Sequence, residues 1–310
     1  MNKKGLFKLL TSLIMLGIVL YFVDFAKLKS TLLHIPLKTL ALVIFGYVLG
    51  QVLSSYKWWT IARSGGRIRV PWNVALKAYF LGMYVNCFTG FGTVGGDVTR
   101  GMLLGHSEAL KTEGVFSVIA DRMHGLLVLI CTAIIAVATV HHADLDALMV
   151  YGLYAAALIL VMGWFVGPAL LLAMVPRDHK LRLKVEGIAS VFPKSPLTII
   201  YVSVISLLFH TVQLSLHWVM GMGVGVNLSA ATILTAVPFV NILSSLPISW
   251  QGLGVRESGY LFFLAAVLST EQALAFGAMW LLAMIVASAL GGIIAVVSGD
   301  LKLVSGRVAG

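Results

Sequence analysis

Charged residues are scarce in this chain of 310 residues, at 11% against roughly 25% in soluble domains. Hydrophobic residues make up 59%, and several apolar runs reach the ~20 residues that cross the hydrocarbon core of a bilayer. This composition excludes an ordinary soluble fold and predicts an integral membrane protein. The apolar segments leave no stretch long enough for a soluble catalytic domain.

Cysteine is scarce too, with only Cys87 and Cys131, and both lie in apolar surroundings. Two such thiols are typical of packing residues and do not indicate a disulfide framework or a metal site. The sequence has no Walker loop, nucleophile elbow or His-Glu metal motif, and GTVGGD (92–97) lacks the βαβ unit that a dinucleotide fingerprint requires. We therefore expect no metal, no cofactor and no catalytic residue.

The net charge of +10 would suit a protein that binds nucleic acid, but the positions of the basic residues indicate a different role. Most of them lie in short loops beside apolar spans, where they set the orientation in the membrane. We expect no nucleic-acid partner.

Six apolar segments are long enough to be full spans, and two more are interrupted. The full spans are expected at 5–23, 39–62, 113–140, 148–174, 197–220 and 272–298. Regions 72–110 and 228–268 are broken by Gly, Pro and polar residues, so each is expected to form two shorter limbs with a tip between them. The first span lacks a small-x-small cleavage site and is interpreted as a retained helix. The predicted fold class is an all-α polytopic membrane protein with one domain, 1–310.

Basic residues predict the orientation of these spans. They gather beside four span ends: Lys3, Lys4, Lys8, Arg63, Arg67, Arg69, Arg177, Lys180, Arg182, Lys184, Lys194, Lys302 and Arg307. The segments 141–147, 221–227 and 269–271 contain no Lys or Arg. The positive-inside rule then places both termini in the cytoplasm, with 299–310 as a tail. Lys27, Lys29 and Lys38 fall in a loop placed outside, against this rule.

With this orientation, region 72–110 enters and leaves from inside, and region 228–268 enters and leaves from outside. We therefore predict two re-entrant hairpins of opposite sense. NCFTGFGTVGGDVTR (86–100) and NILSSLPISWQGLGVR (241–256) match at an offset of 155 or 156 residues, half of the chain. The other elements align at the same offset, which predicts an inverted-topology repeat of halves 1–143 and 144–298. The alternative is that any row of similar apolar helices can be shifted to match.

The first glycine-rich stretch is expected to form a tip inside the membrane, where irregular backbone must be buried in protein or line a cavity. The tip would contain Gly90, Gly92, Gly95 and Gly96, with Asp97 as N-cap of the returning limb and Arg100 in its first turn. A helix start with an arginine is a seat for an anion, most naturally a phosphate. In the second hairpin Pro247 would break the entering limb, Gly252 and Gly254 would make the tip, and Arg256 and Glu257 would open the return.

A third charged pair, Asp121–Arg122, lies inside the 113–140 span, and charges at membrane depth usually face a cavity or each other. Asp97, Asp121 and Glu257 each have an arginine one or three positions away. Three arginines and three carboxylates would leave the site close to neutral before a ligand binds. Two interpretations remain: the pairs only pin the hairpins, or Arg100, Arg122 or Arg256 faces a ligand.

Other polar residues have weaker predictions. Asn86 and Asn241 head the two motifs and are expected to bond the broken backbone. His124 would relay a proton or be a satisfied interior histidine. His210, Gln213 and His217 share one face of the fifth span and can line a water-filled path, but they lack a third ligand for a metal. The tryptophans near span ends fit interfacial belts: Trp58, Trp59, Trp164 and Trp218.

Three runs carry a resemblance to a known family: residues 86–100, SVIADRMHGLL (117–127) and PISWQGLGVRE (247–257). They resemble the signature of the lysylphosphatidylglycerol synthase transmembrane region family, over about residues 5 to 298. That family includes the flippase domain of the bacterial multiple-peptide-resistance proteins, stand-alone membrane proteins, and archaeal relatives associated with dolichol-phosphate sugars.

The resemblance implies a membrane domain with two re-entrant hairpins that moves a phospholipid-type molecule between leaflets. By position it points to Asp97, Arg100, Asp121, Arg122, Arg256 and Glu257. In the multiple-peptide-resistance proteins a soluble aminoacyl transferase follows, whereas this chain stops about ten residues after the last expected span. We therefore expect no synthesis of lysylphosphatidylglycerol, and the resemblance does not assign that lipid as the cargo.

The expected function is lipid translocation in the bacterial inner membrane. An anionic phospholipid or polyprenyl-phosphate conjugate would place its head group between the halves, where the three arginines hold the phosphate in turn. The expected head-group residues are Asn86, Gly95, Gly96, Asp97, Arg100, Asp121, Arg122, Asn241, Gly252, Gly254, Arg256 and Glu257. Without a nucleotide motif, movement would be downhill or ion-coupled, with Asp121, Glu257 or His124 carrying protons.

Two other function classes remain open at this point. One is an intramembrane transferase acting on a lipid-linked sugar, with Asp97 or Glu257 as base, although a paired carboxylate is a poor base. The other is an accessory scaffold in a lipid or glycan pathway. The sequence does not predict the oligomeric state.

Overall fold

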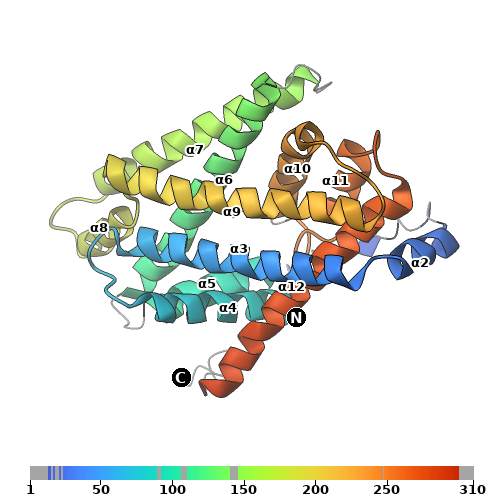
Figure 1. Cartoon of the computed structure of the whole chain (residues 1–310). Helices are drawn as coiled ribbons and strands as arrows, with labels where there is room; N and C mark the ends of the chain where they lie inside the picture. The colour runs from blue at the N-terminus through green and yellow to red at the C-terminus, as the bar shows by residue number, and fades with distance from the viewer. Residues whose placement is uncertain are drawn as a thin grey trace.

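The computed structural model describes residues 13–14, 17, 21, 24–88, 92–105, 110–139, 146–246 and 248–299. Within these residues the regular structure is helical, without strands. The helices are α2 (Phe25–Leu33), α3 (Leu37–Arg63), α4 (Trp72–Phe88), α5 (Gly92–Leu104), α6 (Lys111–Thr139), α7 (Ala147–Ala173), α8 (Arg182–Ser190), α9 (Pro196–Gly223), α10 (Ala230–Ser245), α11 (Val255–Phe263) and α12 (Thr270–Val297). The predicted all-α fold is confirmed (Figure 1).

Five of these helices, α3, α6, α7, α9 and α12, are 27 to 29 residues long and apolar enough to cross a membrane. At about 1.5 Å per residue, each exceeds the roughly 30 Å of a hydrocarbon core. They lie within three residues of the spans expected at 39–62, 113–140, 148–174, 197–220 and 272–298. The span expected at 5–23 falls largely outside the described residues. The chain is therefore a multi-pass membrane protein.

Both interrupted regions form two short helices that pack on each other, as the sequence predicts. In the first region α4 and α5 cross so closely that a Cβ on Gly96 would overlap the carbonyl oxygen of Gly82 and the side chain of Asn86. The tip between them, 89–91, lies outside the described residues, including Gly90. Since α5 begins at Gly92, most of the glycines expected in the tip are helical.

The second region consists of α10 and α11, joined by a turn that contains two glycines with positive φ. Gly252 has φ of 77° and Gly254 has φ of 82°, and glycine adopts such angles without strain. α11 starts at Val255, so Arg256 and Glu257 open its first turn. The expected turn at Gly252 and Gly254 and the helix start at Arg256 and Glu257 are found, whereas the re-entrant course of this region stays a prediction. Pro247, expected to break the entering limb, lies outside the described residues.

Packing between the elements is reciprocal. α3 packs along α9, and the two run side by side through the middle of the molecule (Figure 1). α4 packs on α12, while α10 packs on α6. In the view of Figure 1, α4 and α5 lie on one side of the α3–α9 pair and α10 and α11 on the other.

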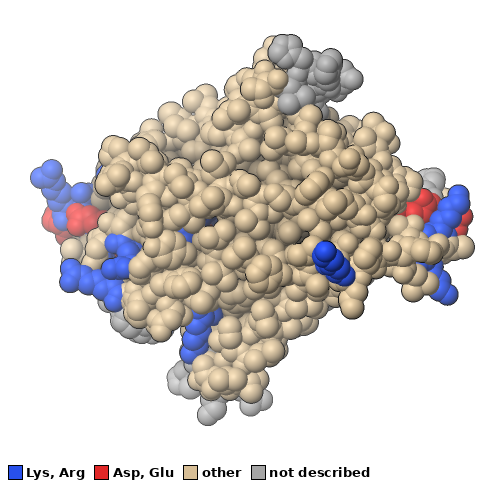
Figure 2. All heavy atoms as spheres, viewed as in Figure 1, with Lys and Arg blue, Asp and Glu red and all other residues tan. Residues whose placement is uncertain are grey.

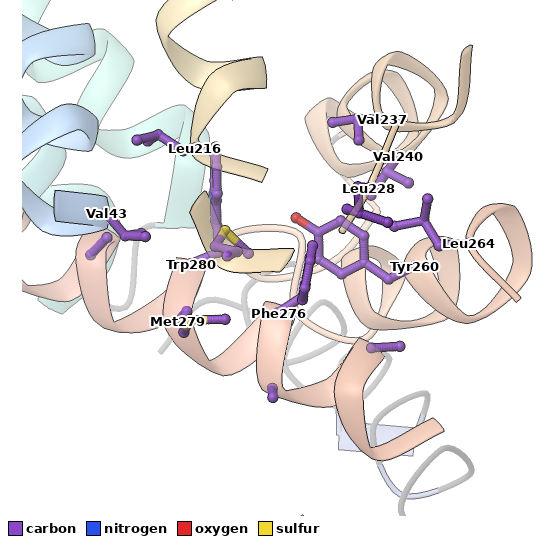
Figure 3. Packing of buried hydrophobic residues seen from close by; sticks show 14 of the residues in the cluster. Val43, Leu216, Leu228, Val237, Val240, Tyr260, Leu264, Phe276, Met279 and Trp280 are labelled. Atoms are coloured by element: carbon purple, nitrogen blue, oxygen red, sulfur yellow. The ribbon is translucent and has the colours of Figure 1, made fainter. Parts of the chain in front are cut away.

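The largest apolar cluster fixes α11 against its neighbours. Tyr260, Phe276 and Trp280 lie together in it, from α11 and α12, beside Leu216 of α9 (Figure 3). The hydroxyl of Tyr260 is hydrogen-bonded to Nε2 of His217 on α9, at 2.9 Å. Because large rings and a buried hydrogen bond hold α11 on two sides, the residues of its first turn have a defined position.

Two short helices, α2 and α8, were not expected from the sequence. α8 lies in the basic segment between α7 and α9, and Arg182 at its start donates to the carbonyl groups of Leu172 and Val175 at 2.6 and 2.8 Å. Figure 2 shows most of the charged residues of this face at its two ends, near α8 and near α2. The broad surface between them is almost uncharged, as expected of a surface in contact with lipid.

Candidate functional site

A cavity of about 640 Å³ lies between the two hairpins and the long helices. Nine helices contribute to its lining: α3, α4, α5, α6, α7, α9, α10, α11 and α12. Seven of the residues predicted for the site line it: Asn86, Asp97, Arg100, Asp121, Arg122, Asn241 and Arg256. The three arginines predicted to share one site therefore do face one cavity.

Asp121 of α6 lies between two cations. Its Oδ1 is 3.0 Å from Nζ of Lys57 on α3, and its Oδ2 is 3.4 Å from Nη2 of Arg100 on α5. None of the three side chains is more than 7% exposed. Lys57 also donates to the backbone carbonyl of Asp121 at 3.1 Å. The three helices are thus joined at the cavity wall by one buried charge network.

The predicted pair Asp121–Arg122 does not form. Arg122 forms an ion pair with Asp97 of α5 instead, and its side chain is 43% exposed. Successive side chains of a helix point about 100° apart, so two adjacent residues do not face each other and cannot easily form an ion pair. The correct pairings link α6 to α5 and α3, which only tertiary structure could show.

Arg100 is held from four directions. Its Nε lies 3.3 Å from Oδ1 of Asp97, and Asp121 accepts from its Nη2. The rings of Trp58 and Tyr79 lie 4.9 and 4.6 Å from its guanidinium carbon, at cation–π distance. Arg100 therefore has little freedom to follow a moving ligand.

The predicted roles of Asp97 as N-cap and of Arg100 in the first turn are wrong. α5 begins at Gly92, so both residues lie in its interior. The start of α5 is held from α4 by Asn86, whose Oδ1 accepts from the N–H of Gly96 at 2.7 Å. Asn86 thus bonds the backbone of the returning limb, as predicted.

Two tryptophans that were expected at the membrane interface are buried instead. Trp58 is fully buried and donates to the hydroxyl of Ser117 at 3.0 Å, so its assignment to an interfacial belt is wrong. Trp164 is also buried and donates to the carbonyl group of Pro193 at 3.1 Å. Trp218 is 47% exposed, as an interfacial residue would be.

Lys57 is the site residue that the sequence analysis missed. It follows SSY and precedes two tryptophans near the end of a predicted span, where a lysine is usually interfacial. The signal that would have found it is a polar face on α3. Tyr47, Gln51, Ser54 and Lys57 follow each other at intervals of four, three and three residues, and all four line the cavity.

Arg256 differs from the other arginines. It is 7% exposed, and its Nη2 donates to the carbonyl group of Gln251 at 3.1 Å. Its guanidinium carbon is 5.9 Å from the ring of Trp280. No carboxylate of the described residues forms an ion pair with it. Arg256 is therefore a buried cation that faces the cavity without a counter-charge from the part of the chain that the structure describes.

Glu257 does not pair with Arg256 and does not line the cavity. Its Oε2 accepts from the N–H of Gly254 at 2.6 Å, so it caps α11. The predicted glycines do not line the cavity either. Gly95 and Gly96 lie within α5, and Gly252 and Gly254 lie in the turn before α11.

Of the histidine stripe on α9, His210 and Gln213 line the cavity, whereas His217 is bonded to Tyr260. His210 Nε2 is hydrogen-bonded to the carbonyl oxygen of Gly125 at 3.0 Å. His124 lies outside the lining and bonds the hydroxyl of Ser203 at 3.1 Å. Among the described residues, no group of three His, Cys, Asp or Glu side chains can hold a metal.

The charge of the lining is not balanced. Among the described residues it contains four cations, Lys57, Arg100, Arg122 and Arg256, and two carboxylates, Asp97 and Asp121. The expectation of near-neutrality is therefore wrong, because Glu257 points elsewhere and Lys57 was not counted. A buried surplus of positive charge is costly unless an anion neutralises it.

One comparison with known proteins gives a match. The family model described as Lysylphosphatidylglycerol synthase TM region matches residues 5–292. No curated protein and no solved structure matches the chain.

Proposed function

Because this chain belongs to the Lysylphosphatidylglycerol synthase TM region family, we propose that it is a lipid translocase of the bacterial inner membrane. Its cargo is an anionic phospholipid or a polyprenyl-phosphate-linked lipid, whose head group crosses through the cavity while the tails stay in the bilayer.

The observation that carries this proposal is the surplus of positive charge in a cavity at the junction of the two hairpins. Arginine and lysine side chains bind phosphate through charge-assisted hydrogen bonds. A volume of about 640 Å³ also falls within the ~300–1,000 Å³ of typical ligand pockets. Of these cations, Arg256 is best placed to accept a phosphate, because no carboxylate of the described residues has to be released first.

The reciprocal packing supports an inverted repeat. The order long helix, paired short helices, long helix occurs twice, as α3, α4–α5, α6 and as α9, α10–α11, α12. If the two units are related by a two-fold axis, each contact has an exchanged counterpart, and α4 on α12 corresponds to α10 on α6. In transporters of this kind the substrate site lies between the repeats, and rocking of one against the other alternates access.

The orientation is proposed from the loop charges. Arg67, in the loop after α3, donates to the carbonyl group of Leu183 in α8. The basic residues of these two segments would lie in the cytoplasm together with both termini. The first hairpin would then open inward and the second outward.

The energy source is proposed to be downhill or ion-coupled, since the sequence has no nucleotide-binding motif. Among the acids considered for proton coupling, a proton on Asp121 would break ion pairs to Lys57 and Arg100. A proton on Glu257 would alter only a cap at the start of α11. Glu257 is therefore the better proposal for coupling.

The test is a vesicle assay with the purified full chain and a lipid whose head group reacts with an impermeant reagent. Translocation predicts that the reactive fraction rises above the outer-leaflet fraction, while mass spectrometry finds the lipid unchanged. A new lipid mass would show a transferase instead. An unchanged reactive fraction for phosphatidylglycerol and for a polyprenyl-phosphate sugar would contradict translocation and would favour the alternative function as an accessory scaffold.

A further inference from the structure

Gln213 of α9 is a buried amide without a hydrogen-bond partner among the residues that the structure describes. It is 3% exposed and lines the cavity, and neither its Oε1 nor its Nε2 has a hydrogen bond. The facing position on α3 is Gly50, where a Cβ would overlap the Nε2 of Gln213. Leaving a buried amide unpaired is costly, so this side chain is suited to a ligand that both donates and accepts hydrogen bonds.

The amide lines the same cavity as Arg256. His217 lies one turn after Gln213, and its ring is 4.9 Å from that of Trp280. Arg256 lies against the same tryptophan ring. The lining also has uncharged polar side chains from α3 and α10: Gln51, Ser54, Asn241, Ser244 and Ser245. A phosphate at Arg256 would thus have amides and hydroxyls around it.

The lining of the cavity offers no unpaired carboxylate to an ammonium group. Asp97 is already bound to Arg100 and Arg122, and Asp121 to Lys57 and Arg100. Two aromatic rings of the lining, Tyr79 and Trp280, are also occupied by arginines. Arg100 covers the rings of Trp58 and Tyr79, and Arg256 lies over Trp280. An amine in this cavity would meet surplus positive charge and no free carboxylate.

We propose that the site selects a phosphodiester whose head group carries uncharged hydroxyls, either a glycerol or a sugar, and rejects head groups that carry an amine. The phosphate binds Arg256, and the hydroxyls bond the amide of Gln213. This inference rests on the proposed lipid translocation and names the class of lipid that is moved.

The test compares binding of matched lipids to the purified full chain by native mass spectrometry. Phosphatidylglycerol and phosphatidylpropanol have the same charge and nearly the same size, but only the first has hydroxyls in its head group. The unmodified protein should bind phosphatidylglycerol about tenfold more tightly, the value of one to two buried hydrogen bonds. Phosphatidylethanolamine and lysylphosphatidylglycerol should bind more weakly than phosphatidylglycerol.

Substitutions then test whether Gln213 causes the preference for phosphatidylglycerol over phosphatidylpropanol. Gln213→Leu, of similar volume, should bring phosphatidylglycerol down to the affinity of phosphatidylpropanol and leave phosphatidylpropanol unaffected. Ser215→Ala, on the exposed side of the same helix, is the control and should leave both affinities unchanged. Should Gln213→Leu fail to fold, Ser244→Ala in the lining should reduce the same preference.

The outcomes separate this inference from the proposed function. If phosphatidylglycerol and phosphatidylpropanol bind equally, or if an amine lipid binds as well as phosphatidylglycerol, the inference is overturned while anionic-lipid binding stands. If no anionic lipid binds, both fail. Tighter binding of a polyprenyl-phosphate hexose than of phosphatidylglycerol identifies the hydroxyls as those of a sugar, and the reverse identifies a glycerol; either supports the inference.

Discussion

Lys57 of α3 and Asp121 of α6 form an ion pair of 3.0 Å in which neither side chain is more than 6% exposed. Arg100 holds the other oxygen of the same carboxylate at 3.4 Å. One acid is therefore paired with two buried cations from two other helices, and one of these, Arg100, is also paired with Asp97. The consequence is an asymmetry, because loss of the acid leaves Lys57 without a carboxylate, whereas loss of the lysine leaves Asp121 paired with Arg100.

The first prediction concerns this network. Asp121→Asn should lower the stability of the protein by about 3–5 kcal/mol, the typical result of leaving a buried charge, here that of Lys57, unpaired. Lys57→Met should cost less, because Arg100 still neutralises the acid. Thermal unfolding in detergent, followed by tryptophan fluorescence, measures both. The double variant should recover part of the loss of Asp121→Asn, whereas simply additive losses would show that the pair is not coupled.

The second prediction concerns the crossing of α4 and α5. Gly96→Ala places a methyl group against the carbonyl oxygen of Gly82 and the amide of Asn86. Overpacking of this kind typically costs about 1–3 kcal/mol. Gly152→Ala is the matched control, since it lies on exposed α7 with no atom within 4 Å of the new Cβ. It should be neutral or slightly stabilising. Equal unfolding midpoints for the two variants would argue against the close crossing.

The third prediction separates capping from proton coupling at Glu257. Glu257→Gln keeps an oxygen that can accept from the N–H of Gly254, so the stability should change by less than about 1 kcal/mol. If Glu257 carries protons, the same variant should lose the stimulation of lipid movement by an imposed pH gradient. Glu257→Leu should lose stability as well, because the cap is removed. If the pH gradient stimulates lipid movement equally in Glu257→Gln, Glu257 only caps α11 and does not carry protons.

The sequence was sufficient for the long helices and for the two paired short ones, because hydrophobic length and glycine or proline breaks are local signals. It also placed Gly252, Gly254, Arg256 and Glu257 correctly at the second tip. The start of α5 was missed because GTVGG has low helix propensity. There, packing on α4 and the hydrogen bond from Gly96 to Asn86 outweigh propensity.

The charge pairs were harder to predict than the helices. Sequence proximity suggested that Arg122 pairs with Asp121, yet each residue pairs with another helix. Such partners depend on the rotation of each helix about its axis, which a sequence of nearly uniform hydrophobicity does not fix. Lys57 was missed for the same reason, although the polar face of α3 pointed to it.

The fourth prediction tests the opposite sense of the hairpins. In a chain with Cys87 and Cys131 replaced by alanine, cysteines are introduced at the exposed positions Arg69 and Asn227, just before each hairpin. In intact cells an impermeant thiol reagent should label Asn227→Cys and should reach Arg69→Cys only after permeabilisation. Labelling of both from the same side would contradict the inverted repeat.

The most direct test of the central claim is head-group accessibility in vesicles that contain the Arg256→Gln variant. Arg256 is a buried cation that has no carboxylate partner among the described residues, so we expect lipid movement to fall at least about tenfold, with an unchanged unfolding midpoint. Arg69→Gln, an exposed arginine away from the cavity, should move lipid like the unmodified protein. Normal lipid movement by Arg256→Gln would contradict the claim that this cavity binds the phosphate.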